Sequence, residues 1–257
     1  METIELVLSN FESLKNKPFN SKLVNVKKLS GGLVNHVYRL VFENNTTAIM
    51  KYFPKFLAFD NNVEMSQDRY FVEKTALELI GNNECFQDTL VRVPKLLYSN
   101  DENFTIIIQD VGESKKTLFE CLKISNEMST SDLEKFLTLI SKGVYQFSKL
   151  ISEKLNIKIE THRVFEKKPK PPYISSVFYD QLKKYNLDKE LEQYSERIQR
   201  WLQIPSEFTN SVFVFGDLWP NSILVDLENN QIWIIDWEMA RFETPFRDLY
   251  QLDFRES

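Results

Sequence analysis

Apolar positions divide the chain into a strand-rich first part and a helix-rich second part. Residues 23–53 hold three apolar runs separated by turn residues, and residues 93–97 and 104–108 hold two more. Each run has the length and the composition of a β-strand. Between them, apolar residues recur at helical spacing over residues 67–80. The pattern predicts a sheet accompanied by one helix up to about residue 111.

Helical spacing dominates the chain beyond Gly112. A continuous apolar stripe over residues 131–151 predicts a core helix, and Ser131 with Glu134 has the spacing of a capping box at its start. Shorter patterns predict helices over residues 3–14 and 187–202. Strands first and helices afterwards make an α+β fold.

Residues 213–238 are the most informative stretch for chemistry. Asp217 follows one apolar run and Asp236 ends another, and a turn-forming Glu-Asn-Asn sequence between them indicates a hairpin. Because a short hairpin holds its two ends close together, both carboxylates are expected to reach one small volume. That volume would suit a divalent cation and a hydroxyl group that needs a base. The alternative is a turn aspartate followed by a strand cap, and the nearby Ser222 and Glu238 weigh against it.

Scarce residue types narrow the chemistry. The chain has two histidines, His36 and His162, far apart in sequence, which disfavours a His-rich zinc site or a Ser-His-Asp triad. Any general base is therefore expected to be a carboxylate. The only two cysteines, Cys85 and Cys121, exclude a disulfide framework and fit a reducing compartment, so we expect a cytoplasmic location.

Length and charge limit the classes of partner. A chain of 257 residues suits one large domain or two closely joined lobes. The formal net charge is −5 and the basic residues are scattered, which weighs against nucleic acid as a partner. No apolar run approaches the roughly 20 residues of a membrane span, and the N-terminus lacks a signal-peptide pattern. We therefore expect no membrane partner, and the sequence leaves the oligomeric state open.

The first part of the chain holds two further candidates. The turn Gly31-Gly32 between the first two strands could lie over phosphate groups and offer them backbone N–H donors, although an ordinary loop is the alternative. Glu73 shares an edge of its predicted helix with apolar residues, so it points at the margin of the core and needs a partner. Lys51, which ends the third strand, is the natural candidate. The alternative is a surface glutamate that pairs with Lys74 or with nothing, and Glu78 is then the reserve candidate.

Several of these stretches resemble one family. Protein-kinase-like folds carry a catalytic loop, Asp-x-x-x-x-Asn, and later an aspartate that ends a strand and binds metal. The small-molecule branch, which includes aminoglycoside phosphotransferases, choline kinases and methylthioribose kinases, often reads H-G-D-x-x-x-x-[NS] and then I-D-x-E. This chain reads FGDLWPNS and IDWE. Trp219-Pro220 is similar to fungal members, and Ser222 with the D-x-E form is similar to methylthioribose kinases.

The resemblance continues in the first part of the chain. Residues 48–51, AIMK, are similar to the kinase V-A-I-K, and Arg69 to Leu77 match the pattern R-x-x-x-E-x-x-A-L. The resemblance implies a two-lobed protein-kinase-like fold. It would have an antiparallel-sheet N-lobe over residues 1–111 that binds nucleotide. The mostly helical C-lobe over residues 112–257 would carry the catalytic loop and the metal site.

The resemblance also implies a nucleotide site for ATP. Lys51 would hold the α- and β-phosphates and Glu73 would orient it, with Gly31 and Gly32 over the phosphates. Backbone groups around Gln109 to Val111 would pair with the edge of the adenine.

The catalytic and metal-binding roles fall in the second part of the chain. By the resemblance, Asp217 would accept or orient the hydroxyl of the acceptor, and Asp236 would bind Mg²⁺. Glu238 would assist at a second ion or through water, and Ser222 would replace the usual asparagine ligand. Asp248, in a PFRDL sequence similar to D-P-x-x-D-L, would support the backbone of the catalytic loop.

These roles imply an ATP-dependent phosphotransferase acting on a hydroxyl group of a small molecule. The alternative is a non-catalytic or weakly active kinase-like nucleotide-binding protein. Phe215 departs from the family by replacing its usual histidine. Only residues 250–257 follow Leu249, where family members continue with helices that build the acceptor pocket. From the sequence we expect those helices to be missing and ATP–Mg²⁺ binding to exceed phosphoryl transfer.

Overall fold

The computed structural model describes residues 19–29, 34–58, 62–81, 83–155, 157, 163–165, 212–243 and 248. Gly31 and Gly32 lie outside the described residues, as do the helices predicted over residues 3–14 and 187–202.

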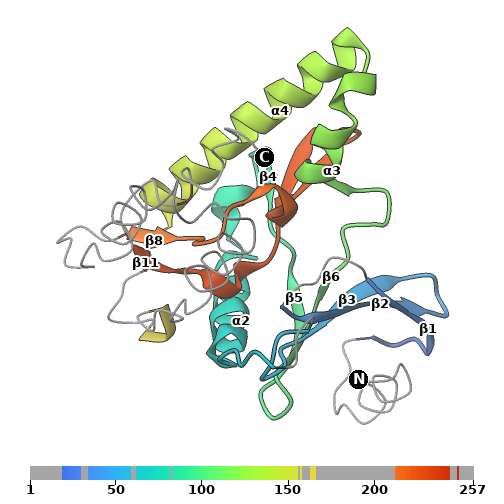
Figure 1. Ribbon diagram of the computed structural model, residues 1–257, viewed down its shortest axis with the longest axis vertical. Coiled ribbons are helices and arrows are strands. Elements are labelled where there is room, and N and C mark those ends of the chain that lie inside the picture. Colours follow the sequence, from blue (N-terminus) through green and yellow to red (C-terminus); the bar gives the residue numbers. More distant parts are fainter. Residues whose placement is uncertain are drawn as a thin grey trace, which may run out of the picture.

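A five-stranded antiparallel sheet forms the first part of the molecule (Figure 1). Its strand order is β1-β2-β3-β6-β5, and the strands are β1 (Leu23–Lys28), β2 (His36–Phe42), β3 (Thr47–Tyr52), β5 (Leu96–Asn100) and β6 (Thr105–Gln109). The three strands predicted over residues 23–53 are confirmed. Lys51 lies opposite Val37 of β2 on one side and Ile106 of β6 on the other, so it occupies the middle strand of the sheet.

One predicted strand is displaced. Of the strand expected over residues 93–97, only Leu96 and Leu97 lie in a strand, β5, and residues 93–95 lie in none. The separate strand β4 (Val91–Arg92), which joins a different sheet, ends just before the run. Pro94 lies between β4 and β5, and a proline has no backbone N–H to donate to a neighbouring strand. The predicted strand therefore begins three residues late, after the proline, and the two residues before the run pair in another sheet.

The two faces of the five-stranded sheet have different roles. Because side chains alternate along a strand, one set of apolar residues packs in a small cluster of its own. That cluster contains Val26, Tyr38, Leu40, Phe42, Ala48, Met50 and Ile107. The opposite set includes Lys51 and Ile106, and Ile106 packs in the main core with α2 (Asp68–Ile80). The predicted helix over residues 67–80 is confirmed, and it lies against the face that carries Lys51.

The second part of the chain adds two smaller sheets. One has the strand order β4-β10-β9-β7, with β7 (Lys116–Thr117), β9 (Ile223–Asp226) and β10 (Gln231–Ile234). The other pairs β8 (Val212–Val214) with β11 (Arg241–Glu243). Strands β9 and β10 are antiparallel and are joined by the turn at residues 227–230, so the predicted hairpin is confirmed.

Helices α3 (Leu118–Lys123) and α4 (Thr130–Lys149) lie at the other end of the molecule from the five-stranded sheet (Figure 1). The predicted capping box of α4 was placed two residues too late. Ser129 caps the helix, because its Oγ accepts a hydrogen bond from the Asp132 N–H at 3.2 Å and donates one to Asp132 Oδ2 at 2.7 Å. Ser131 already lies within the helix, where its hydroxyl cannot cap the first turn.

The buried side of α4 consists of Phe136, Leu139, Gly143 and Phe147. A Cβ atom at Gly143 would lie 2.7 Å from the Ile232 side chain of β10, so the missing side chain lets helix and sheet approach closely. Beyond Lys149 the chain continues as a π-helix, η3 (Leu150–Lys154). The described 3₁₀ helices are η1 (Glu84–Phe86), η2 (Ser125–Glu127), η5 (Arg163–Phe165), η6 (Pro220–Ser222) and η7 (Trp237–Met239).

Candidate active site

Lys51 and Glu73 form a buried ion pair between β3 and α2. The Lys51 Nζ and Glu73 Oε2 atoms are 2.6 Å apart, and the two side chains are 4% and 1% exposed. The predicted pairing of these two residues is confirmed. The alternative partner, Lys74, instead donates to Asp101 in the turn between β5 and β6.

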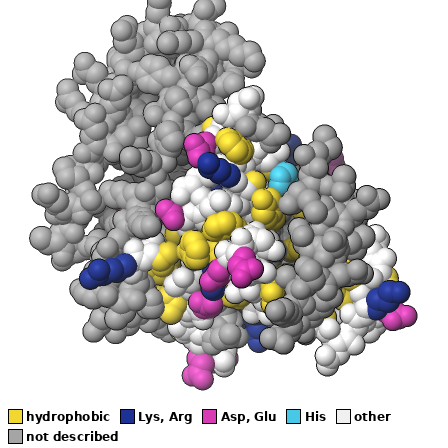
Figure 2. Space-filling view, turned by 90° about the horizontal axis from the view of Figure 1, so that it is seen from below, with side chains coloured by type: hydrophobic (Ala, Val, Ile, Leu, Met, Phe, Trp, Pro, Cys, Tyr) yellow, Lys and Arg dark blue, Asp and Glu magenta, His cyan; other side chains and the backbone are white. Residues whose placement is uncertain are grey.

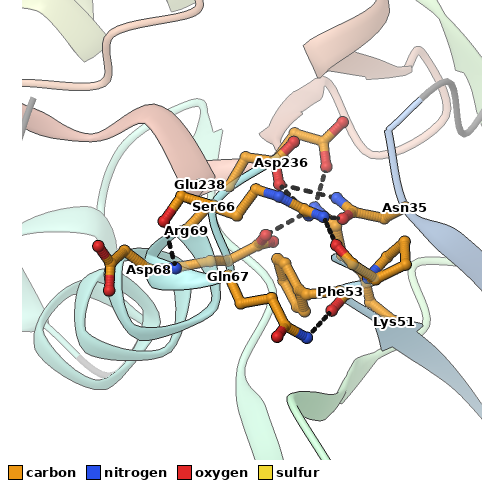
Figure 3. A network of polar contacts seen from close by, with 11 residues as sticks. Asn35, Lys51, Phe53, Ser66, Gln67, Asp68, Arg69, Asp236 and Glu238 are labelled. Carbon is orange, nitrogen blue, oxygen red and sulfur yellow. Dashed lines mark hydrogen bonds and ion pairs between the residues drawn. The ribbon is translucent and has the colours of Figure 1, made fainter. Parts of the chain in front are cut away.

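Asp236 gives Lys51 a second carboxylate partner. It follows β10 with φ 71° and ψ 59°, in the left-handed region that aspartate tolerates better than most residues. Its Oδ1 accepts a hydrogen bond from Lys51 Nζ (Figure 3). The Asp236 side chain is nevertheless 45% exposed, so one of the two carboxylates around Lys51 is buried and the other is accessible.

The excess of carboxylates determines the protonation of this cluster. Burial opposes the charge of Lys51, but the fields of Asp236, Glu73 and Glu238 outweigh it and hold the lysine pKa well above its ordinary value. Burial raises the pKa of Glu73 to about 7, and Asp236 and Glu238 add to the rise while Lys51 opposes it. Lys51 is therefore a fixed cation, and Glu73 is the carboxyl group that gains a proton near neutral pH.

A second polar group lies beside the first and involves two residues that the sequence analysis had not assigned. The Glu238 Oε2 atom accepts a hydrogen bond from Asn35 Nδ2 at 2.8 Å and lies 3.5 Å from Arg69 Nη1. Arg69 Nη1 in turn donates to Asn35 Oδ1 (Figure 3). Arg69 stands four residues before Glu73 and so lies on the same helix face, a signal that could have identified it. The sequence holds no comparable signal for Asn35.

The loop that carries Asp217 is shaped by its backbone. Gly216 has φ +90°, and a Cβ atom there would lie 2.1 Å from the carbonyl oxygen of Met239, so only glycine fits. The Asp248 carboxylate accepts hydrogen bonds from the N–H groups of Phe215 at 2.8 Å and Gly216 at 2.6 Å. The expected contact between Asp248 and this loop is confirmed. Asp217 follows directly and is half-buried.

The Asp217 loop and the Asp236 loop lie side by side. The rings of Phe215 and Trp237 meet edge to face with centroids 4.8 Å apart, and the Ile235 N–H donates to the Ser222 carbonyl oxygen at 2.9 Å. Phe215 is fully buried in this contact. The aromatic ring of Phe215 therefore joins the two loops by packing.

Ser222 is engaged within its own loop. Its side chain is buried, and its Oγ accepts a hydrogen bond from the Trp219 N–H at 3.1 Å. The same oxygen lies 2.8 Å from the Trp219 carbonyl oxygen and 3.2 Å from that of Asp217. In this arrangement the hydroxyl stabilises the loop, and a role for Ser222 as a metal ligand stays a prediction.

Among the described residues, no group of three or more His, Cys, Asp and Glu side chains is placed to hold a metal ion. The accessible Asp236 carboxylate suits Mg²⁺ in another way. Mg²⁺ commonly binds through one or two carboxylates together with substrate phosphates and water, and needs no preformed cage. The donor set therefore fits a metal that arrives with a phosphate-bearing ligand.

The segment after β6 is tied to the sheet by a buried ion pair. The Arg39 Nε and Nη2 atoms donate to the two oxygens of Asp110 at 2.6 and 3.1 Å, and Asp110 Oδ1 also accepts from the Gly112 N–H at 2.9 Å. Gln109 and Val111 flank Asp110 and are half-buried. Their backbone contacts to an adenine stay a prediction. The sequence did not predict this ion pair, because no local pattern links Arg39 to Asp110.

The surface and the helices give little further indication of partners. In the view of Figure 2, described charged side chains of both signs are scattered among apolar ones. No helix in the described part of the chain combines the length and the apolar character needed to cross a membrane. Both cysteines are free thiols, and Cys121 is buried.

Comparison with known proteins finds similarity to small-molecule phosphotransferases. Residues 173–252 match the family described as phosphotransferase enzyme family. The chain is also similar to 4-hydroxytryptamine kinases of Psilocybe cyanescens and Psilocybe cubensis, with 24% and 25% identity over 87% of this chain. The predicted resemblance to small-molecule kinases is confirmed. The chain spans 65% of the length of each of these two proteins.

Solved structures support the fold. A GDP complex of an aminoglycoside 2′-phosphotransferase has a TM-score of 0.55 and 18% identity, covering 96% of this chain and 74% of that chain. A type I macrolide 2′-phosphotransferase has a TM-score of 0.51 and 16% identity, covering 97% and 77%. The chain has the two-lobed α+β fold of these kinase-like phosphotransferases, as the sequence predicted.

Proposed function

We propose that this protein transfers the γ-phosphoryl group of ATP to a hydroxyl group of a small molecule. The observation that carries the proposal is the convergence of Lys51, Glu73 and Asp236 in one cluster beside the loop of Asp217. A fixed cation, an accessible carboxylate and a second carboxylate on an adjacent loop are the parts that phosphoryl transfer requires. The similarity to named small-molecule kinases supports the same reaction class.

The lysine side of the site would bind the nucleotide. Lys51 is protonated at all relevant pH values and is held by Glu73, so it can meet the α- and β-phosphates without first changing its charge. Gln109 and Val111 would meet the adenine edge, and Gly31 with Gly32 would cover the phosphates. We accordingly assign residues 1–111 to a nucleotide-binding lobe and residues 112–257 to a lobe carrying the catalytic loop and the metal site.

Asp236 would hold Mg²⁺ together with phosphate oxygens of the nucleotide. When bound, the ion would neutralise charge on the phosphates and so favour departure of ADP. Lys51 would then exchange its contact with Asp236 for one with a phosphate. Ser222 and Glu238 were predicted as further ligands, but their described contacts are to protein groups.

Asp217 would act as the base or orienting group. The hydroxyl oxygen of the acceptor attacks the γ-phosphorus, the bond from that phosphorus to the β,γ-bridging oxygen breaks, and ADP leaves. The hydroxyl proton passes to the Asp217 carboxylate. The half-buried position of Asp217, beside the loop of Asp236, supports this assignment.

The test has a binding arm and a transfer arm. Thermal shift with ATP, in the presence and absence of Mg²⁺, is compared for the wild type and Asp236→Ala. We expect Mg²⁺ to increase the stabilisation by ATP in the wild type only. ADP release is then followed with a panel of hydroxyl acceptors that includes 4-hydroxytryptamine, an aminoglycoside and a macrolide, since proteins similar to this chain are named for these compounds.

Acceptor-dependent ADP release by the wild type would support the proposal. Mg²⁺-dependent ATP binding without transfer to any acceptor would favour the alternative, a non-catalytic nucleotide-binding protein. The absence of ATP binding would reject both functions. A cytoplasmic location stays a prediction from the cysteine content.

A further inference from the structure

The polar group around Glu238 contains two charged side chains that are buried. The Arg69 side chain is 1% exposed and that of Glu238 is 9% exposed. Burying a charged group is costly unless it is paired and hydrogen-bonded. Arg69 and Glu238 are paired, but pairing need not repay the full cost of removing two charges from water. A pair held this deeply beside the Lys51 cluster therefore calls for a role that outweighs the remaining cost.

Three polar side chains of this group each contact the other two (Figure 3). The Asn35 amide donates to Glu238 through Nδ2 and accepts from Arg69 through Oδ1, and Arg69 Nη1 lies 3.5 Å from Glu238 Oε2. Arg69 Nη2 also donates to the Pro54 carbonyl oxygen at 2.5 Å. We call Asn35, Arg69 and Glu238 the arginine clamp.

The arginine clamp joins three separate parts of the chain. Asn35 directly precedes β2, Arg69 lies in the first turn of α2, and Glu238 lies in η7. On two of these elements, a clamp residue lies close in sequence to a residue of the candidate active site. Arg69 is one helical turn before Glu73, and Glu238 is two residues after Asp236.

The clamp and the Lys51 cluster also share an aromatic ring. The Phe53 ring centroid is 5.2 Å from Lys51 Nζ and 5.4 Å from the central guanidinium carbon of Arg69. Both cations are thus held against one fully buried ring. Movement of α2 relative to η7 would disturb the clamp and the contacts of Lys51 together.

Two details argue against a metal ligand at Glu238. Its Oε2 atom is already engaged by Asn35 and Arg69, and the neighbouring guanidinium would repel a divalent cation.

We propose that Glu238 is a positioning residue: through the arginine clamp it locks η7 to α2 and so sets where Asp236 lies relative to the Lys51–Glu73 pair. The expected consequence is that the clamp affects nucleotide and metal binding, and this part rests on the proposed function. The lock between α2 and η7 is a property of the protein without ligand and can be measured by itself.

The experiment compares Arg69→Met, Glu238→Gln and the double variant with Glu78→Gln, an exposed charge change on the same helix. The double variant matters because it leaves no buried charge unpaired, so it should fold even if a single variant does not. The first measurement is hydrogen exchange without ligand over α2 and residues 235–240. The second is the Mg²⁺ concentration that gives half the full thermal shift with saturating ATP.

The clamp requires Arg69→Met to reproduce the effect of Glu238→Gln. Both variants should speed exchange in α2 and residues 235–240 alike, and both should raise the half-saturating Mg²⁺ concentration by about tenfold. The double variant should be no worse than either single one, because all three lose the same contact. Glu78→Gln should match the wild type.

A metal ligand at Glu238 would give a different pattern. Glu238→Gln alone would then raise the Mg²⁺ requirement, while Arg69→Met would behave like Glu78→Gln, and that result would overturn the proposal. Unchanged hydrogen exchange in the double variant would overturn it as well. If the wild type binds no ATP, the proposed function fails, yet the hydrogen-exchange comparison still decides whether the lock exists.

Discussion

The two halves of the candidate active site are built differently. The lysine half, Lys51 and Glu73, is placed by a strand and a helix, and both side chains are almost fully buried. The aspartate half, Asp217 and Asp236, stands on loops. One of its residues has positive φ, and the Asp236 side chain is nearly half exposed.

The difference separates stability from reactivity. A buried ion pair on regular elements keeps one geometry, because helix and strand leave it no room to relax. Carboxylates on loops stay accessible to ligands, and their position depends on special backbone conformations and on tertiary contacts. Substitutions in the lysine half should therefore alter folding and binding, whereas substitutions in the aspartate half should alter turnover with less effect on folding.

The largest expected effect is on turnover. Asp217→Asn removes the base but keeps the size of the side chain, so turnover should fall by about 10²- to 10⁴-fold while ATP affinity changes little. Initial rates of ADP release with an accepted substrate measure it. Glu228→Gln, in the exposed turn of the β9–β10 hairpin, is the control and should leave the rate unchanged. A full rate in Asp217→Asn would exclude the catalytic role.

The next effect contrasts the two partners of one ion contact. Lys51→Met leaves the buried Glu73 carboxyl without its cation and should lower the free energy of unfolding by about 3 kcal/mol. Asp236→Asn changes a half-exposed group and should cost less than about 1 kcal/mol. Urea denaturation of both variants provides the comparison. Equal losses would mean that the halves do not differ in the way described.

Glycine-to-alanine substitutions test how much the close packing of the Asp217 loop contributes to stability. Gly216→Ala should destabilise the protein by at least about 2 kcal/mol, since it combines a strained φ with a clash against Met239. Gly112→Ala is a matched control with φ +102° and no atom near the added Cβ, so only strain of about 1 kcal/mol is expected. Similar thermal unfolding of the two variants would show that the close approach at Gly216 relaxes easily.

The smallest expected effect is a pH dependence of the lysine half. The folded protein holds the Glu73 proton up to about pH 7, whereas the unfolded chain releases it near pH 4.5. Between these values the folded state binds more protons, so raising the pH should destabilise the wild type relative to Glu73→Gln by more than about 1 kcal/mol. Urea midpoints of both proteins across pH 4.5–8 measure it. Parallel curves would place the pKa of Glu73 near its ordinary value.

Local patterns predicted most of the elements and several of the pairings. Strand and helix periods located β2, β3, α2 and the β9–β10 hairpin, because each depends on side-chain spacing within a few residues. Glu73 was recognised from its place at the edge of an apolar stripe. Its pairing with Lys51 followed because a carboxylate at the margin of the core needs a cation. Capping was misplaced at Ser131, since neighbouring serines offer the same side chain and only the geometry of the first turn selects Ser129.

Contacts between distant segments could not be predicted in this way. Asn35 and Glu238 are 203 positions apart, and Arg39 and Asp110 are 71 apart. No period or spacing rule relates such residues, because their meeting depends on how several elements pack at once. The late start of the strand predicted at residues 93–97 has a similar cause: Val91 and Arg92, just before it, pair with β10 of another sheet, and β5 begins only at Leu96.

The sequence by itself determined the order of strands and helices, the two aspartates around a hairpin, and the residue types available for chemistry. Those features follow from local side-chain patterns, which act before the chain has folded. The tertiary structure alone decided that Asp236 shares Lys51 with Glu73, that Ser222 bonds within its own loop, and that Glu238 faces Arg69 and Asn35. Such choices among hydrogen-bonding partners are made only when burial removes water as an alternative partner, and burial is a property of the whole fold.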